Sequence, residues 1–242
     1  MERAANNSSE RTPLTAVLAK FVCELEFENL QQNAVHEVKR ALLDFLGVSL
    51  LGADHKVVNV LLAYLAEMRG AQTKLASEGA TVIGRAERLD PVAAAWVNGT
   101  MGHEYDFDDV HSAAGIHPGI VIVPGSLAAA EMVGASGRKL IAAMAAGYEV
   151  AGRVGTATQL THYEPGWHST GTIGTLGAAA AAANVLGLDA TQSILIAARL
   201  RARANRTRPS IRIPGRPIRR SWRCHASPTI ASATRLHNPF YA

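Results

Sequence analysis

Cysteine and aromatic residues are scarce in this chain of 242 residues. Its two cysteines, Cys23 and Cys224, stand far apart in unlike contexts, which argues against a disulfide framework and against a cysteine-based zinc site. Aromatic residues make up 5% of the chain whereas alanine is abundant, so closely packed helices are favoured over a β-sandwich. The cysteine usage predicts a reducing compartment, the cytoplasm.

Long apolar runs are missing as well, although hydrophobic residues make up 48% of the chain. No run reaches the roughly 20 residues that a bilayer-spanning helix needs. The polar start, MERAANNSSERTP, lacks the apolar centre of a secretion signal. We therefore expect a cytoplasmic protein with no membrane partner and with enough apolar content to bury a sizeable core.

Acidic residues and lysine are absent from residues 199–242, which contain eleven arginines and five of the ten prolines. Residues 1–198 are left with 13 basic and 20 acidic residues. The basic segment begins within an amphipathic pattern, without a helix-stop signal. One interpretation is an aberrant tail, frame-shifted or disordered, because local signals normally agree in an evolved sequence. The other is an arginine-rich arm for nucleic acid or an anionic membrane. We expect the aberrant tail, and so no nucleic-acid partner.

Apolar positions recur at three- and four-residue spacing between residues 14 and 198, which is typical of amphipathic helices. Asp90 and Pro91 form a helix start, since the carboxylate can cap the first turn and proline lacks an N–H that would be unpaired there. We expect helices at 15–25, 33–53, 57–70, 91–107, 121–133, 136–157, 172–188 and from 189 or 191 onward, with a short extended piece at 80–84. The sequence therefore predicts an all-α domain at 14–198, after a disordered lead at 1–13.

Three histidines and four carboxylates gather in HEYDFDDVHSAAGIHPG, residues 103–119. On a continued helix, either His103, Asp106 and Asp109 or Glu104, Asp108 and His111 would share a face. The stretch could bind a divalent metal, transfer protons through carboxylate–imidazole pairs, or form a solvated helix end. It has neither the HExxH spacing of zinc proteases nor the period of a calcium-binding loop, which weakens the metal interpretation. His103 by itself is interpreted as a structural histidine.

Gly174 and Gly177 lie in the helix predicted at 172–188, and Gly171 directly precedes it. The three glycines fall on nearly one face. Their spacing is GxxGxxG, and no strand precedes them, so a dinucleotide-binding loop is disfavoured. Interior glycines weaken a helix and therefore suggest close contact with a neighbouring helix.

Several segments together resemble the MmgE/PrpD family, which includes 2-methylcitrate dehydratases and cis-aconitate decarboxylases. The segments are ALLDFLGVSLLGA, NGTMGHEYDFDDVH, GIHPG, AAMAAGYEVAGRVG and GWHSTGTIGTLGAAAAAANVLGLDATQ, in this order. The similarity covers about residues 14–198. It implies a multi-helix N-terminal domain in a truncated chain that lacks the family's α+β lid domain, and it implies a homodimer.

The resemblance assigns Asp106, His117 and His168 to the active site. It implies proton transfer by the two histidines, with Asp106 orienting an imidazole, and it places Asp109 and His111 beside them as substrate-binding residues. It implies a small carboxylic acid as substrate and requires neither a metal nor an organic cofactor.

Two features of this sequence depart from the family pattern. Val110 stands where the family's cis-aconitate decarboxylases carry threonine, and no lysine follows Lys139, although the family uses later lysines in its site. We therefore predict a metal-independent lyase of the 2-methylcitrate dehydratase type, acting on a small di- or tricarboxylic acid and impaired in this chain. A cis-aconitate-type decarboxylase, and a catalytically inactive helical fragment or association module, are the alternatives.

Overall fold

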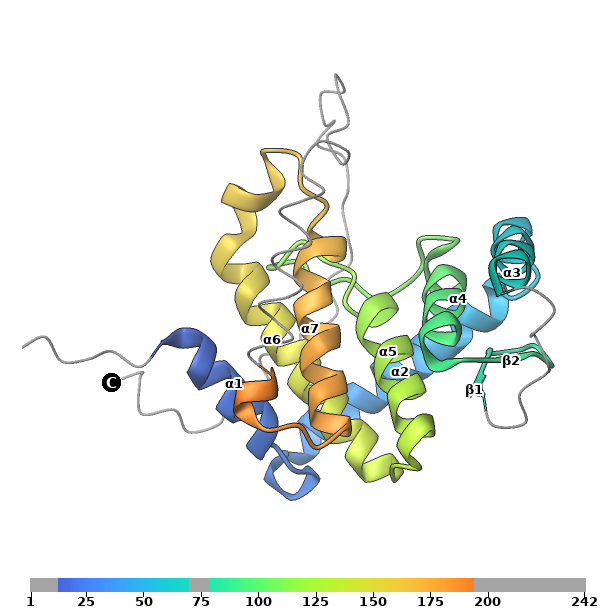
Figure 1. Cartoon of the computed structure of the whole chain (residues 1–242). Helices are drawn as coiled ribbons and strands as arrows, with labels where there is room; N and C mark the ends of the chain where they lie inside the picture. The colour runs from blue at the N-terminus through green and yellow to red at the C-terminus, as the bar shows by residue number, and fades with distance from the viewer. Residues whose placement is uncertain (1–12, 70–78, 194–242) are drawn as a thin grey trace, which may run out of the picture.

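The computed structural model describes residues 13–69 and 79–193 and confirms the all-α class (Figure 1). The predicted tail at 199–242 and the predicted lead, apart from Pro13, lie outside the described residues. The elements are α1 (Leu14–Glu24), a 3-10 turn η1 (Phe27–Asn29), α2 (Gln32–Gly52), α3 (Lys56–Arg69), β1 (Ala80–Thr81), β2 (Arg88–Leu89), α4 (Pro91–His103), α5 (Gly119–Val133), α6 (Gly137–Tyr163) and α7 (Ser169–Val185). The two short strands pair antiparallel, and β1 falls within the predicted extended piece.

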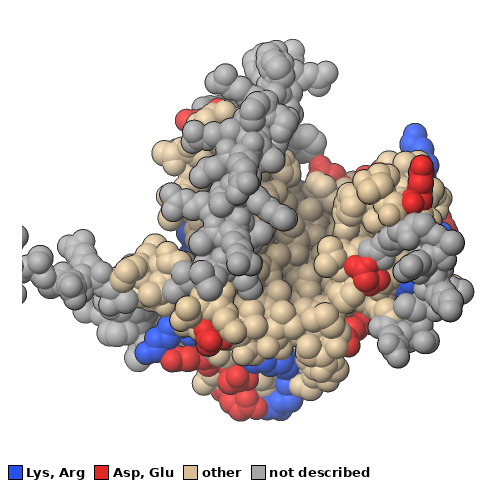
Figure 2. Space-filling view, in the orientation of Figure 1, with Lys and Arg blue, Asp and Glu red and all other residues tan. Residues whose placement is uncertain are grey.

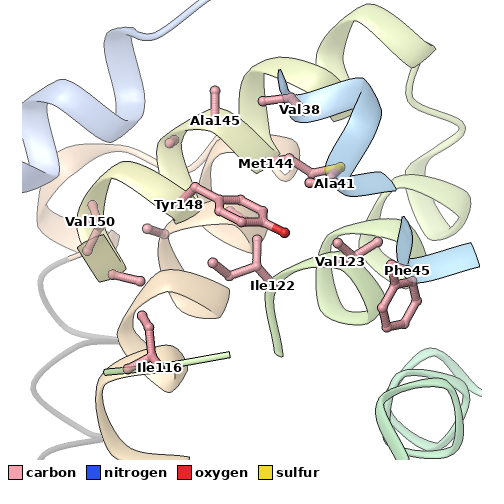
Figure 3. Close-up of a cluster of buried hydrophobic side chains, with 14 of the residues drawn as sticks. Val38, Ala41, Phe45, Ile116, Ile122, Val123, Met144, Ala145, Tyr148 and Val150 are labelled. Atoms are coloured by element: carbon pink, nitrogen blue, oxygen red, sulfur yellow. The ribbon is translucent and has the colours of Figure 1, made fainter. Parts of the chain in front are cut away.

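The helices pack around a core to which α2, α5 and α6 contribute many of the buried side chains. α6 lies along α7, α5 packs against α7 and α4, and α2 contacts α4, α5 and α6, running behind them in Figure 1. Figure 3 shows the centre of this core, where Phe45 of α2, Ile122 of α5 and Met144 of α6 are almost completely buried. The apolar residues that recur at helical spacing in the sequence thus pack against neighbouring helices.

Two glycines allow α6 and α7 to approach closely. A Cβ atom on Gly147 would lie 2.8 Å from the carbonyl oxygen of Gly177, and a Cβ on Gly177 would lie 2.8 Å from that of Gly147. Gly174 meets α5, because a Cβ there would lie 2.6 Å from Val121 Cγ2. The predicted packing role is confirmed for Gly174 and Gly177, whereas Gly171 lies in the first turn of α7 beside His168.

The start of α4 is as predicted, but its predicted end was wrong. Asp90 accepts hydrogen bonds from the backbone N–H groups of Val92 and Ala93 and so caps the helix. The helix ends at His103 and does not continue to residue 107. At Asp106 the backbone adopts φ 56°, a conformation incompatible with a continuing helix and one that aspartate tolerates better than most residues. The acidic stretch therefore leaves the helix as a loop.

The other helix boundaries differ from the predictions by a few residues. α6 runs to Tyr163, six residues past its predicted end, and α7 covers Ser169–Val185 in place of 172–188. Asp189 and Gln192 exchange side-chain to backbone hydrogen bonds at the predicted start of the last helix, of which residues 190–193 are described.

Within the described ranges, no single helix is both long and apolar enough to cross a membrane, although α2 and α3 pass that test jointly across an 85° bend. Figure 2 shows a broad uncharged area across the middle of one face, with many of the Lys, Arg, Asp and Glu side chains toward its lower edge.

Candidate active site

Residues 104–118 join α4 to α5 and carry most of the predicted site residues. An isolated antiparallel bridge joins His111 and Ile116, with the His111 N–H donating to the Ile116 oxygen at 2.9 Å. Gly115 closes the turn between them with φ 61°, a conformation that suits glycine. This bridge and turn shorten the loop and bring His117 back toward the end of α4.

Asp108 lies at the centre of the site and contacts two imidazoles. Its side chain is 1% exposed. Its Oδ1 lies 2.9 Å from His103 Nδ1, in a hydrogen bond, and its Oδ2 lies 3.1 Å from His117 Nδ1, in an ion-pair contact that lacks hydrogen-bond direction. The two imidazole rings meet edge to face, with centroids 5.1 Å apart. One buried carboxylate therefore holds two histidines on the same side of the loop.

The charges of this trio stabilise one another. Burial acts to raise the pKa of Asp108, but the close contacts with the His103 and His117 imidazoles outweigh it and lower that pKa to about 2. The contact with Asp108 raises the pKa of His103 and that of His117, against the opposing effect of burial. Both imidazoles consequently favour their protonated form more than a free histidine does.

Asp106 contacts His117, and the first turn of α7, which His168 caps, is tied to the His117 backbone. Asp106 Oδ1 lies 3.9 Å from His117 Nε2, and this carboxylate is 56% exposed. The backbone N–H of His117 donates to Thr170 Oγ1 at 3.0 Å, which ties the loop to the first turn of α7. His168 precedes that turn and caps it, with Nδ1 accepting from the N–H of Gly171 at 3.3 Å.

His168 differs from His117 in its preferred protonation state. Burial lowers the pKa of His168, and the positive charges of His103 and His117 lower it further. The structure thus brings Asp106, His117 and the His168 end of α7 together, with one imidazole biased toward the cation and another toward the neutral base. Their catalytic roles stay predictions.

Asp109 turns the other way from Asp108, toward the start of α5. Its Oδ1 accepts from the N–H of Gly119 at 2.7 Å and its Oδ2 accepts from the hydroxyl of Tyr148 at 2.8 Å. Burial raises the pKa of Asp109 to about 6. Both of its oxygens are occupied by protein donors, so substrate binding by Asp109 stays a prediction.

His111, the other residue predicted to bind substrate, is 8% exposed. Its Nδ1 accepts from the N–H of Ala114 at 3.1 Å, and its Nε2 is buried without a hydrogen-bond partner among the described residues. Burial lowers its pKa. Its position braces the 111–116 turn, and contact with substrate stays a prediction.

His103, Asp106, Asp108 and His117 each offer one possible metal-ligand atom, and these atoms lie within 4.8 Å of one another. Geometry alone would thus admit a divalent ion. The imidazole–carboxylate contacts described above account for the same closeness, because they pair the charges directly.

Two members of this cluster were missed from the sequence. His103 was interpreted as a structural histidine, and Asp108 was aligned with Glu104 and His111 on a continued helix but not assigned to the active site. The assumed continuation of α4 separated Asp108 from His103, whereas the turn at Asp106 brings the two together. The density of histidine and aspartate in residues 103–119 was the available signal.

Comparison with known proteins gives one family. Residues 16–200 match the family model described as the MmgE/PrpD N-terminal domain. The cis-aconitate decarboxylase-like protein oryM of Aspergillus oryzae is 32% identical over 198 residues, which cover 77% of this chain and 40% of that protein. The cis-aconitate decarboxylases of Mus musculus and Homo sapiens are 33% and 32% identical over 185 residues, covering 74% of this chain and 36% and 37% of theirs. The chain therefore spans about 40% of the length of these relatives or slightly less.

Proposed function

The chain belongs to the MmgE/PrpD family, and from this premise we propose that its loop 104–118 and the start of α7 form part of a lyase site for a small di- or tricarboxylic acid. The observation that carries the proposal is the meeting of Asp106, His117 and the His168 end of α7. An elimination needs a base and an acid, and two imidazoles with opposite preferences for the proton can supply them.

Protonated imidazoles at the site, although paired with Asp106 and Asp108, can donate to an anionic substrate. The raised pKa of His103 and that of His117 keep more of each imidazole protonated near neutral pH. The N-terminus of α7 adds the positive end of its helix dipole. A substrate carboxylate placed between the loop and α7 would meet both.

The two histidines can divide the proton transfers between them. Neutral His168 suits a base that removes a proton from a carbon next to a carboxylate, and protonated His117 suits an acid. In dehydration, the C–H electron pair forms the C=C bond while the C–O bond breaks, and the hydroxyl leaves as water with the acid's proton. In decarboxylation, a C–C bond breaks, carbon dioxide leaves, and the electron pair remaining on the substrate takes up a proton from the acid. Asp106, near His117 Nε2, would orient that imidazole.

Decarboxylation of a cis-aconitate-like acid is the first candidate, since the relatives named above are cis-aconitate decarboxylases or resemble them. Dehydration of a 2-methylcitrate-like acid is the second, and Val110 favours it. A valine lacks the hydroxyl that the decarboxylases place there, and a lost hydrogen bond to a substrate carboxylate weakens that substrate's binding.

The test is to incubate the purified chain with cis-aconitate and with 2-methylcitrate and to follow substrate and product by proton NMR. We expect turnover of one of them that is lost in His117→Gln and in His168→Gln and reduced in Asp106→Asn. A surface variant, His36→Gln, serves as control and should keep the activity. Absence of both turnover and binding for both acids would reject the proposal and favour the inactive fragment or association module. The predicted homodimer and cytoplasmic location stay predictions.

A further inference from the structure

Asp108 is a buried carboxylate of the loop, and the proposed chemistry does not use it. Its side chain is 1% exposed, compared with 56% for Asp106, only two residues away. It faces His103 Nδ1 with one oxygen and His117 Nδ1 with the other. A buried carboxylate is costly unless it is paired, so this arrangement has a reason beyond solubility of the loop.

We propose that Asp108 is a positioning residue that shares its carboxylate between His103 and His117, holding the proton of His117 on Nδ1 and leaving Nε2 as its proton-transfer nitrogen. His103 is the second positioning residue, because it occupies the other oxygen and so limits how strongly Asp108 holds His117. This inference rests on the proposed function only for its consequence in catalysis. The sharing of the Asp108 carboxylate between His103 and His117 does not depend on the proposed activity.

The backbone geometry supports a fixed orientation of His117. The His117 N–H donates to Thr170 Oγ1, which fixes the backbone at this residue, and its Nδ1 lies 3.1 Å from Asp108 Oδ2, which draws that side of the ring toward the carboxylate. Its Nε2 is the nitrogen nearest to the exposed Asp106. A carboxylate this close to one ring nitrogen favours the proton on that nitrogen electrostatically, and so leaves the other nitrogen free to exchange a proton.

The neighbouring aspartate anchors the other end of this arrangement. Asp109 accepts from the N–H of Gly119, two residues beyond His117, and a Cβ on Gly119 would lie 2.5 Å from Asp109 Oδ1. The pair Asp108–Asp109 therefore fixes both the ring of His117 and the start of the helix that follows it. The loop cannot shift at one point without disturbing the other.

Several charged groups act on these imidazoles, and a test must separate them. His117 interacts with Asp108, Asp106 and Asp109 and repels the charge of His103, which in turn interacts with Asp106 and Asp108. His168 is affected by both imidazoles, and Asp44 by Asp108. The variants below remove one of these influences at a time.

The experiment is an NMR pH titration of the histidine ring protons of the full chain, with each resonance assigned by single His→Gln variants. In Asp108→Asn we expect His103 and His117 both to bind their protons about tenfold or more weakly, since each loses an opposite charge within 4 Å. Asp106→Asn is the matched control, and it should change His117 less and His103 least because its carboxylate is farther away and exposed.

His103→Gln tests the sharing without touching Asp108. It should strengthen proton binding at His117, because the competing cation is removed and Asp108 is left to a single imidazole. Nitrogen-15 shifts of neutral His117 should show the proton on Nδ1. The idea is overturned if Asp108→Asn leaves either imidazole unchanged, or if His103→Gln leaves His117 unchanged. If Asp108→Asn folds poorly, Asp108→Glu and His103→Gln still test the proposal.

These titrations need no substrate, so they decide the inference even if the proposed lyase activity fails. Where turnover is measured, Asp108→Asn should lower kcat/KM by about 100-fold or more, as loss of an imidazole-orienting carboxylate does elsewhere. It should also move the limb of the pH profile that belongs to His117 toward lower pH, and His103→Gln should move it toward higher pH. A purely structural role would lower activity without moving that limb. Added EDTA should leave both imidazole titrations unchanged, and a change would instead indicate a bound metal.

Discussion

Replacement of Asp109 by asparagine should change how the stability of the protein depends on pH. The carboxylate is held by the N–H of Gly119 and the hydroxyl of Tyr148, and burial raises its pKa from 3.8 to about 6. Asparagine keeps the shape and one acceptor. Its carbonyl can accept from Gly119, and its amide can donate to the Tyr148 oxygen once that hydroxyl rotates. The variant removes the charge with little change in packing.

The direction of the effect follows from proton binding. The folded state keeps the Asp109 proton up to about pH 6, whereas the unfolded chain releases it near pH 4. Stability contributed by this group is therefore present below about pH 4 and is lost as pH rises toward 6. One pKa unit corresponds to about 1.4 kcal/mol, so the wild type should lose about 3 kcal/mol relative to Asp109→Asn over this interval.

The assay is urea unfolding of both proteins at half-unit steps from pH 4 to 7.5, followed by circular dichroism. The quantity of interest is the difference between the two free energies of unfolding, because the other titrating groups are common to both proteins. Asn98→Ala is the control, since asparagine does not titrate, and its difference from wild type should not vary with pH in this way. A difference for Asp109→Asn that is the same at pH 4 and pH 7 would refute the reasoning.

Three further predictions concern packing, an internal anchor and metal. Gly147→Ala should destabilise the protein by about 1–3 kcal/mol, because its Cβ would lie 2.8 Å from the Gly177 oxygen. Gly125→Ala should instead stabilise α5 by up to about 1 kcal/mol, because the nearest atom to its Cβ would be 4.0 Å away. Equal effects of the two alanines in thermal unfolding would contradict the packing argument. Asn98→Ala should cost about 1–3 kcal/mol, because buried Asn98 accepts from the Ile83 N–H and donates to the Thr81 oxygen. Amide exchange should then accelerate at Ile83, and an unchanged rate would count against this anchor. Dialysis against EDTA should leave the melting temperature unchanged, and a drop of several degrees would show that a metal supports the fold.

The sequence predicted the helices well because their burial follows the local period of apolar residues. It failed at the end of α4, because the turn at Asp106 serves contacts of Asp108 with His103 and His117 that no helical period encodes. Asp90 was predictable as a cap, since its partners lie two and three residues away.

The same limit applies to the residues of the candidate site. Asp106, His117 and His168 were named only through the resemblance, because they come from the loop and from the start of α7, segments that a single sequence does not bring together. The partnership of Asp109 with Tyr148 depends on how α6 packs beside the loop, 39 residues further along the chain. Contacts of that range are set by tertiary packing and left no pattern in the sequence.

A ligand titration of the histidine side chains tests most directly whether this loop and α7 form one site for an anion. With cis-aconitate added to the purified chain, the resonances of His117 and His168 should move together and yield the same Kd, and His117→Gln should weaken the response of His168. Independent responses with different Kd values, or a shift at only one of the two imidazoles, would contradict a single site.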